Sequence, residues 1–226
     1  MTVEKLVTKV LAHYAKEGRG HLPWRKTSDP YKVLVSEIML QQTQVDRVVP
    51  KYKNFIRVFP TVKALAAAPL KKVLLQWQGL GYNRRARYLW LSAQKVVGEY
   101  GGKFPKDASA LQTLPGVGPY TARAVVTFAF NTPEVFIETN IRTIFTYFYF
   151  YPHNQGQSLV SPTQKIADSE LLLLIEKALG VALKRGVESR EWYAALMDYG
   201  AHLKQGGLRI NNQSKHYTKQ STFEGS

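Results

Sequence analysis

Residues 107–130 decide the fold of this chain, and they read DASALQTLPGVGPYTARAVVTFAF. A short helix is predicted over 107–112, and a second one over 119–130, which opens on a proline at the position where helices tolerate it best. The turn between them contains Gly116 and Gly118. Glycine permits a positive φ and leaves the backbone uncovered, so the amides of such a turn can face a phosphate. An ordinary turn is the alternative, but it rarely needs two glycines at this spacing. The stretch therefore predicts a phosphate-binding helix-hairpin-helix.

Helical spacing of apolar residues continues on both sides of this hairpin. The predicted helices lie near the N-terminus and at 31–45, 50–58, 61–67, 70–76, 84–99, 141–149, 163–179 and 189–204. No segment alternates with a period of two for long enough to predict a sheet. The aromatic run 145–151 has the composition of a strand, but it continues a helical pattern that starts at Ile141. The predicted fold class is all-α.

The charge of the chain indicates the class of its partner. Lysine and arginine number 31 against 16 acidic residues, which gives a formal net charge of +15. Such an excess favours a polyanion, and nucleic acid first of all, although a solubilising surface would show the same balance. No stretch approaches the ~20 uninterrupted apolar residues of a membrane span, so no membrane partner is expected.

The absence of cysteine limits the chemistry of the chain. Disulfides, thiolate nucleophiles and cysteine-ligated metals are excluded, and an iron–sulfur cluster held by cysteines cannot form. The five histidines are scattered, without a ligand spacing such as His-Glu-x-x-His. No metal is therefore expected in a catalytic role.

Four stretches resemble one known superfamily. LPGVGPYTA at 114–122 resembles the hairpin of the helix-hairpin-helix (endonuclease III-like) DNA glycosylases. HLPWRKTSDPYKVLVSEIMLQQTQV at 21–45 and FPTVKALAAAPLKKVLLQWQGLGYNRRAR at 59–87 are similar to the adenine DNA glycosylase (MutY-type) branch, and the similarity resumes at MDYGA, residues 197–201. The string SEIMLQQTQV is long and unusual enough to make the resemblance specific.

The resemblance implies two helical domains that flank a DNA-binding cleft. One is a helical barrel over 22–132, which contains the hairpin. The other joins residues 1–21 to residues 133–205. The polar, basic segment 206–226 is either a frayed tail or an arm that lies along DNA.

Glu37 is the candidate proton donor. A glutamate beside glutamines on a polar helix stripe would ordinarily be a solvated residue. The resemblance, however, places it where the family has the acid that protonates adenine, and neutral adenine is a poor leaving group. A buried carboxyl group with a raised pKa can supply that proton.

A second carboxylate is expected at Glu138, in the segment FIETNIR, residues 136–142. In the family this position is an aspartate that stabilises positive charge near C1′ of the sugar, as carboxylates do in glycoside hydrolysis. Here the side chain is one methylene longer, and the plainer interpretation is an acid at a helix N-terminus. Asn140 resembles the family's partner of that acid near the sugar.

Tyr120 follows the hairpin where bifunctional relatives have a Schiff-base lysine. Tyrosine cannot form that bond, so the resemblance implies a monofunctional enzyme. It further implies a base pocket and a set of DNA contacts. The expected pocket residues are Trp24, Arg25 and Asp198. The expected DNA-binding residues are Gln42, which fills the stack, Tyr82, which wedges beside the opposing base unless it is mere core packing, and Arg85, Arg87, Gly116, Val117 and Gly118.

The predicted function is hydrolysis of the N-glycosidic bond of a mispaired adenine, opposite guanine or 8-oxoguanine. Two alternatives stay open. A thymine or uracil mismatch glycosylase would use the same scaffold, although a pyrimidine leaving group does not need the proton of Glu37. A non-catalytic binder of mismatches or lesions is the other alternative, because Glu138 departs from the family pattern.

The expected partner is double-stranded DNA with a mispair or lesion, bound by a monomer. No iron–sulfur cluster is expected, and a monovalent cation at the hairpin is compatible with the resemblance. The expected location is the cytoplasm at the nucleoid in a prokaryote, or the nucleus in a eukaryote.

Overall fold

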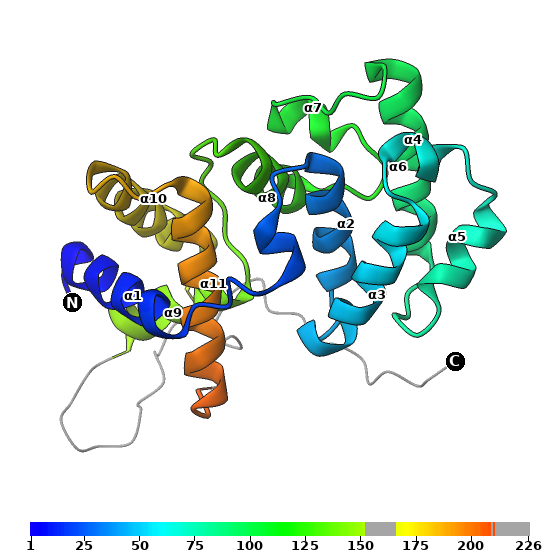
Figure 1. Cartoon of the computed structure of the whole chain (residues 1–226). Helices are drawn as coiled ribbons and strands as arrows, with labels where there is room; N and C mark the ends of the chain where they lie inside the picture. The colour runs from blue at the N-terminus through cyan, green and yellow to red at the C-terminus, as the bar shows by residue number, and fades with distance from the viewer. Residues whose placement is uncertain (152–165, 209, 211–226) are drawn as a thin grey trace. The chain divides into compact units, whose positions relative to one another are not determined.

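The computed structural model describes residues 1–151, 166–208 and 210, and the regular elements in these ranges are helices joined by loops (Figure 1). The all-α prediction is confirmed. The helices are α1 (Val3–Glu17), a 3₁₀ helix η1 (Pro23–Lys26), α2 (Pro30–Leu40), α3 (Val45–Val58), α4 (Val62–Ala66), α5 (Leu70–Trp77), α6 (Arg84–Tyr100), α7 (Ala108–Gln112), α8 (Pro119–Phe130), α9 (Thr139–Phe150), α10 (Asp168–Lys184) and α11 (Ser189–Gln205). Among the described residues, no helix is both long and apolar enough to cross a membrane.

The chain divides into two compact units. The first contains Met1–Arg19 and the described residues from Val135 onward, and the second contains Gly20–Glu134. The first unit therefore consists of α1, α9, α10 and α11, and the second consists of η1 and α2 to α8.

In the second unit, α2 lies at the centre of the hydrophobic core. It packs against α3, α6 and α8. Its N-terminus is fixed because Asp29 accepts a hydrogen bond from the Tyr31 amide (2.9 Å) and Pro30 occupies the first helical position. Every residue from Val33 to Met39 is buried. Because this helix is covered on almost all sides, a polar stripe in its sequence does not face water.

The end of α2 differs from the prediction for a physical reason. The sequence predicts one helix over 31–45 and another from Pro50, but α2 ends at Leu40 and α3 begins at Val45. Gln42 between them has a φ of 56°, in the left-handed region that breaks a helix. The final carbonyls of α2 are satisfied by the distant Arg85 instead of by further helical amides. Pro50 lies inside α3, although proline favours the first turn.

In the first unit, α11 packs against α9 and α1, and α1 also packs against α10. The contact of α9 with α11 depends on a glycine. A Cβ atom at Gly200 would lie 2.4 Å from the carbonyl oxygen of Asn140. Only glycine fits so close to a backbone atom of the neighbouring helix. Helix α10 begins at Asp168 and ends at Lys184, later than the predicted 163–179, and residues 163–165 lie outside the described part of the chain.

Candidate functional site

The second unit places Glu37 against Tyr120. Glu37 lies on the third turn of α2 and is 8% exposed. Tyr120 lies on the first turn of α8, which packs against α2. The Tyr120 hydroxyl donates a hydrogen bond to Oε2 of Glu37 (3.0 Å). These two residues are 83 positions apart in the sequence, and both were predicted to be catalytic. The structure therefore joins a buried carboxyl group, which can exchange a proton, to a hydroxyl that fixes its orientation.

The hairpin consists of α7, the turn 113–118 and α8. Gly116 has a φ of 75°, and a Cβ atom there would lie 2.8 Å from Cβ of Tyr88, so glycine is required by both backbone and packing. Gly118 has an ordinary φ of −84°, and a Cβ atom there would meet no atom within 4 Å. The absence of a side chain at Gly118 is therefore not explained by the packing of the described residues, and it leaves the backbone open to a ligand.

Val117 lies between these glycines with its side chain buried in the core of the unit. Its amide donates to the Leu114 carbonyl (3.1 Å) and closes the turn. Of the three hairpin residues predicted to contact phosphate, Gly118 is the one whose surroundings suit that role, together with the first-turn amides of α8, which have no intrahelical acceptor.

Gln42 and Tyr82 occupy two exposed turns with unusual backbone geometry. Gln42 follows α2, and Tyr82 precedes α6 with a φ of 50° and 46% of its surface exposed. Non-glycine residues rarely adopt a positive φ, and such strain persists only where the surroundings hold it. Exposure excludes the alternative that Tyr82 is core packing. The intercalating roles of both side chains stay predictions.

Arg85 joins these two turns. Its guanidinium donates to the end of α2 and to the turn before α6, and it lies over the rings of Trp77 and Tyr82 (both 5.5 Å). The acceptors are the carbonyl oxygens of Ile38 (2.9 Å), Met39 (3.1 Å), Gln41, Leu80 (2.9 Å) and Gly81 (3.2 Å), and the Thr43 hydroxyl (3.1 Å).

This arrangement gives Arg85 a role inside the protein, and its predicted DNA contact stays a prediction. A planar guanidinium has five donors in a fixed fork, and here the fork is directed at the chain's own carbonyls. Burial is the main cause that lowers the pKa of Arg85 from its ordinary value, but arginine stays charged at neutral pH. Arg87, two residues later, is exposed and remains suited to a phosphate contact. No pattern in the sequence indicates this difference between two arginines that lie two positions apart.

Trp24 and Arg25 lie on η1, also in the second unit. Trp24 is buried in the hydrophobic core, edge-on to Tyr52 at 5.5 Å between ring centroids. The Arg25 guanidinium lies over the ring of Phe128 on α8 (5.8 Å). The structure thus brings both residues into the packing between η1 and its neighbours, and their predicted role in a base pocket stays a prediction.

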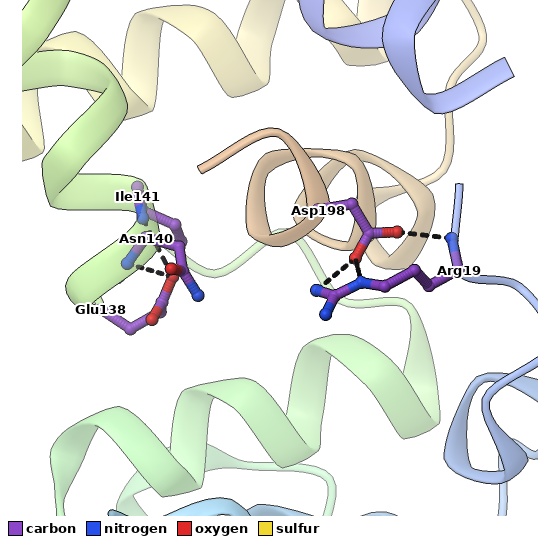
Figure 2. A network of polar contacts seen from close by, with 5 residues as sticks. All are labelled: Arg19, Glu138, Asn140, Ile141 and Asp198. Atoms are coloured by element: carbon purple, nitrogen blue, oxygen red, sulfur yellow. Dashed lines mark hydrogen bonds and ion pairs between the residues drawn. The ribbon is translucent and has the colours of Figure 1, made fainter. Parts of the chain in front are cut away.

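In the first unit, Glu138 is the N-cap of α9 (Figure 2). Its Oε1 atom accepts hydrogen bonds from the amides of Asn140 (2.8 Å) and Ile141 (2.9 Å). Oε2 accepts none from the described residues, so the second oxygen of this half-buried carboxylate is open. The additional methylene of glutamate is accommodated by folding the side chain back over its own helix. The carboxylate is thereby fixed at the positive end of a helix dipole, beside the side chain of Asn140.

Asp198 lies on α11 in the same unit and is 3% exposed. Its carboxylate binds Arg19 at three points: the Arg19 amide donates to Oδ2 (2.8 Å), and Nε and Nη2 contact Oδ1 at 2.8 and 2.7 Å (Figure 2). A fork contact of this kind is among the stronger charged hydrogen bonds. Asp198, predicted as a pocket residue, therefore holds the segment after α1 onto α11. Sequence reasoning missed Arg19, because its partner is 179 positions away.

The sequence model of the family described as "HhH-GPD superfamily base excision DNA repair protein" matches residues 35–166, more than half of the chain. The chain is 39% identical over 149 residues to an adenine DNA glycosylase of Buchnera aphidicola subsp. Baizongia pistaciae, which covers 66% of the chain and 42% of that protein. It is 43% identical over 137 residues to an adenine DNA glycosylase of Mycolicibacterium smegmatis, and this alignment covers 60% of the chain and 47% of that protein. The aligned part thus spans less than half the length of these curated relatives.

Solved structures resemble the whole described fold. A thermostable thymine-DNA glycosylase superposes with a TM-score of 0.69 at 26% identity, covering 88% of this chain and 86% of that one. A non-covalent endonuclease III–DNA complex superposes with a TM-score of 0.62 at 20% identity, and the superposition covers 88% of this chain and 84% of that one. The second likeness concerns the fold alone.

Proposed function

The chain belongs to the HhH-GPD superfamily of base excision DNA repair proteins, and on that basis we propose that it is a monofunctional DNA glycosylase that hydrolyses the N-glycosidic bond of a mispaired adenine. One observation carries the proposal: Glu37 is buried and bonded to the Tyr120 hydroxyl. The adenine glycosylases of other organisms, at about 40% identity, support the choice of adenine.

In the proposed reaction, Glu37 transfers its proton to the departing adenine while the bond from C1′ to the base breaks. Water then adds to C1′ and gives one proton to the Glu37 carboxylate, which leaves an abasic site, free adenine and the restored acid. Tyr120 holds the Glu37 carboxyl group through its hydroxyl and offers no amine for a Schiff base, so the strand is not cleaved by β-elimination at this residue.

Glu138 is proposed to stabilise the positive charge that develops at the sugar. Its Oε1 is engaged by two amides, so the carboxylate keeps a fixed direction and needs no reorganisation as the charge develops. Asn140 is proposed as the neighbouring polar contact near the sugar.

Double-stranded DNA is the proposed partner, bound by a monomer, and the protein is proposed to act where DNA is, at the nucleoid or in the nucleus. The chain has no cysteine to hold an iron–sulfur cluster, so no step involves one. The open backbone at Gly118 suits a monovalent cation held by hairpin carbonyls. Replacing K⁺ by tetramethylammonium at equal ionic strength should then weaken duplex binding, and unchanged binding would remove the cation from the proposal.

The proposal is tested by single-turnover excision on labelled duplexes with one central A:G, A:8-oxoguanine, T:G, U:G or matched A:T pair. Alkali treatment afterwards reveals abasic sites. We expect strand breaks at the adenine of the A:G or A:8-oxoguanine duplex after alkali treatment. Without alkali, we expect no strand breaks. Excision of thymine or uracil alone would replace the proposal by a pyrimidine mismatch glycosylase. Tight mismatch binding without any product would replace it by a binding protein.

A first prediction concerns Gly118. Gly118→Ala keeps the fold, because the added Cβ atom meets open space, but it obstructs the approach of a phosphate. Because phosphates contain no sequence information, affinity should fall similarly for matched and mismatched duplexes. Wild-type affinity itself should fall by ~10³ when salt rises from about 50 to about 200 mM, if roughly six phosphates are neutralised. A loss confined to mismatched duplex, measured by fluorescence anisotropy, would contradict this role of the hairpin.

A second prediction concerns Arg85. Arg85→Lys replaces a five-donor fork by one ammonium group, so several carbonyls at the end of α2 lose their partner. We expect the free energy of unfolding to fall by about 2 kcal/mol. We also expect single-turnover excision to fall by roughly 100-fold at saturating protein, because Gln42, Tyr82 and Glu37 lose their fixed positions.

Arg87→Lys is the matched control, since it makes the same change two residues away on an exposed side chain. It should leave stability and single-turnover rate unchanged and weaken DNA binding at most slightly. If Arg85→Lys behaves in the same way as Arg87→Lys, Arg85 is not a positioning residue.

A further inference from the structure

Three side chains of types that can bind a metal ion gather in the first unit. They are His13 and Glu17 on α1, and His202 on α11. One ligand atom from each lies within 4.8 Å of the other two. No sequence pattern predicts this group, because His202 follows His13 by 189 positions and only the packing of α11 on α1 brings them together.

The geometry of the two helices produces the cluster. His13 and Glu17 are four residues apart on α1, so they lie on the same face, one turn from each other. His202 lies in the last turn of α11. The two imidazole rings are 4.6 Å apart between centroids, and Tyr199 packs against both, edge-on to His13 at 5.2 Å and stacked on His202 at 6.2 Å. The rings are therefore positioned by packing and not by hydrogen bonds, since none of the described residues is hydrogen-bonded to either imidazole.

The local electrostatics favour a cation although the chain as a whole is strongly basic. Glu17 is the last residue of α1, and His202 is three residues before the end of α11. The C-terminal ends of both helices thus lie at the cluster, and the dipole of each helix adds partial negative charge to that of Glu17.

We propose that His13, Glu17 and His202 form a binding site for Zn²⁺ that links α1 to α11. Two imidazoles and one carboxylate are borderline ligands that suit zinc, and a fourth, tetrahedral position would be filled by water. Ligand atoms of a tetrahedral zinc site lie roughly 3.3 Å apart, given bonds of about 2.0–2.1 Å. Glu17 and His202 are exposed, so their side chains can rotate to close the difference. This site is independent of the proposed glycosylase activity.

The test is zinc titration of the metal-stripped full chain in the absence of DNA, by calorimetry. We expect one equivalent to bind with saturation. Loss of a residue that only hydrogen-bonds to a metal ligand commonly weakens metal binding by about 10- to 100-fold. His202→Ala removes a ligand itself, so we expect it to weaken zinc binding by about 100-fold or more. Glu17→Gln should weaken it less. His21→Ala, an exposed histidine of the other unit, is the matched control and should bind as wild type does.

Two further measurements separate a true site from loose association. Co²⁺ in place of zinc should give the visible bands of a tetrahedral complex in wild type and His21→Ala, and not in His202→Ala. Zinc at about a hundredfold excess over Kd should raise the melting temperature of wild type by roughly 5 °C or more, and should not raise that of His202→Ala. Absence of saturable binding, or binding equal in wild type and His202→Ala, would overturn the proposal.

Discussion

Glu37→Gln should abolish adenine release while duplex binding stays within a few fold of wild type. A general acid typically contributes ~10²–10⁴ in rate, and adenine leaves poorly without a proton, so a loss of about 10³-fold or more is expected. Glutamine has nearly the same shape and can still accept the hydrogen bond of the Tyr120 hydroxyl. The substitution thus removes the proton and leaves the packing of α2 intact. Single-turnover excision and anisotropy on the same A:G duplex measure the two quantities.

The matched control is Glu99→Gln, which makes the same chemical change on the surface of the same unit. Glu99 is 61% exposed and pairs with Lys95 one turn away, an interaction of small energy. Its variant should excise at the wild-type rate. If Glu37→Gln keeps about a tenth or more of that rate, the proton comes from elsewhere, because the loss would fall below the range of general acid catalysis.

Glu138→Gln is expected to have the second-largest effect. It should lower the single-turnover rate by ~10²–10³, the cost of removing one preorganised electrostatic contact to the transition state. The glutamine side-chain oxygen can still cap α9 by accepting from the Asn140 and Ile141 amides, so stability should change little. Glu188→Gln, the same change at the N-cap position of α11 in the same unit, is the control and should leave the rate unchanged.

Glu138→Asp distinguishes an adapted site from a degenerate one. Aspartate is a good N-cap residue, so the helix should persist. Because the longer side chain is already fixed by two amides, the shorter one should lower the rate or leave it unchanged. A single-turnover rate more than about tenfold above wild type on an A:G duplex would show that glutamate holds its charge too far from C1′ of the sugar. Misplacement of a catalytic group by about 1 Å can lower the rate by ~10²-fold.

Local patterns in the sequence were sufficient to predict the positions of several helices and of the hairpin. The predicted helices 70–76, 84–99 and 119–130 agree with α5, α6 and α8 to within one residue at each end. These helices follow from apolar spacing and from proline and glycine at their ends, which act within a few residues along the chain. The string around Glu37 likewise indicated the family, because an unusual series of residues can be recognised without knowledge of its contacts.

Tertiary structure alone decided which polar side chains are buried and what they bind. The sequence could not show that Arg85 serves the end of α2, 47 positions from Ile38, while Arg87 faces solvent. It could not pair Arg19 with Asp198, or bring His202 beside His13. The reason is physical: a periodic pattern records which face of a helix is apolar, whereas the partner of a buried charge depends on how distant helices pack. Only that packing offers the carbonyls, carboxylates and imidazoles that such a charge requires.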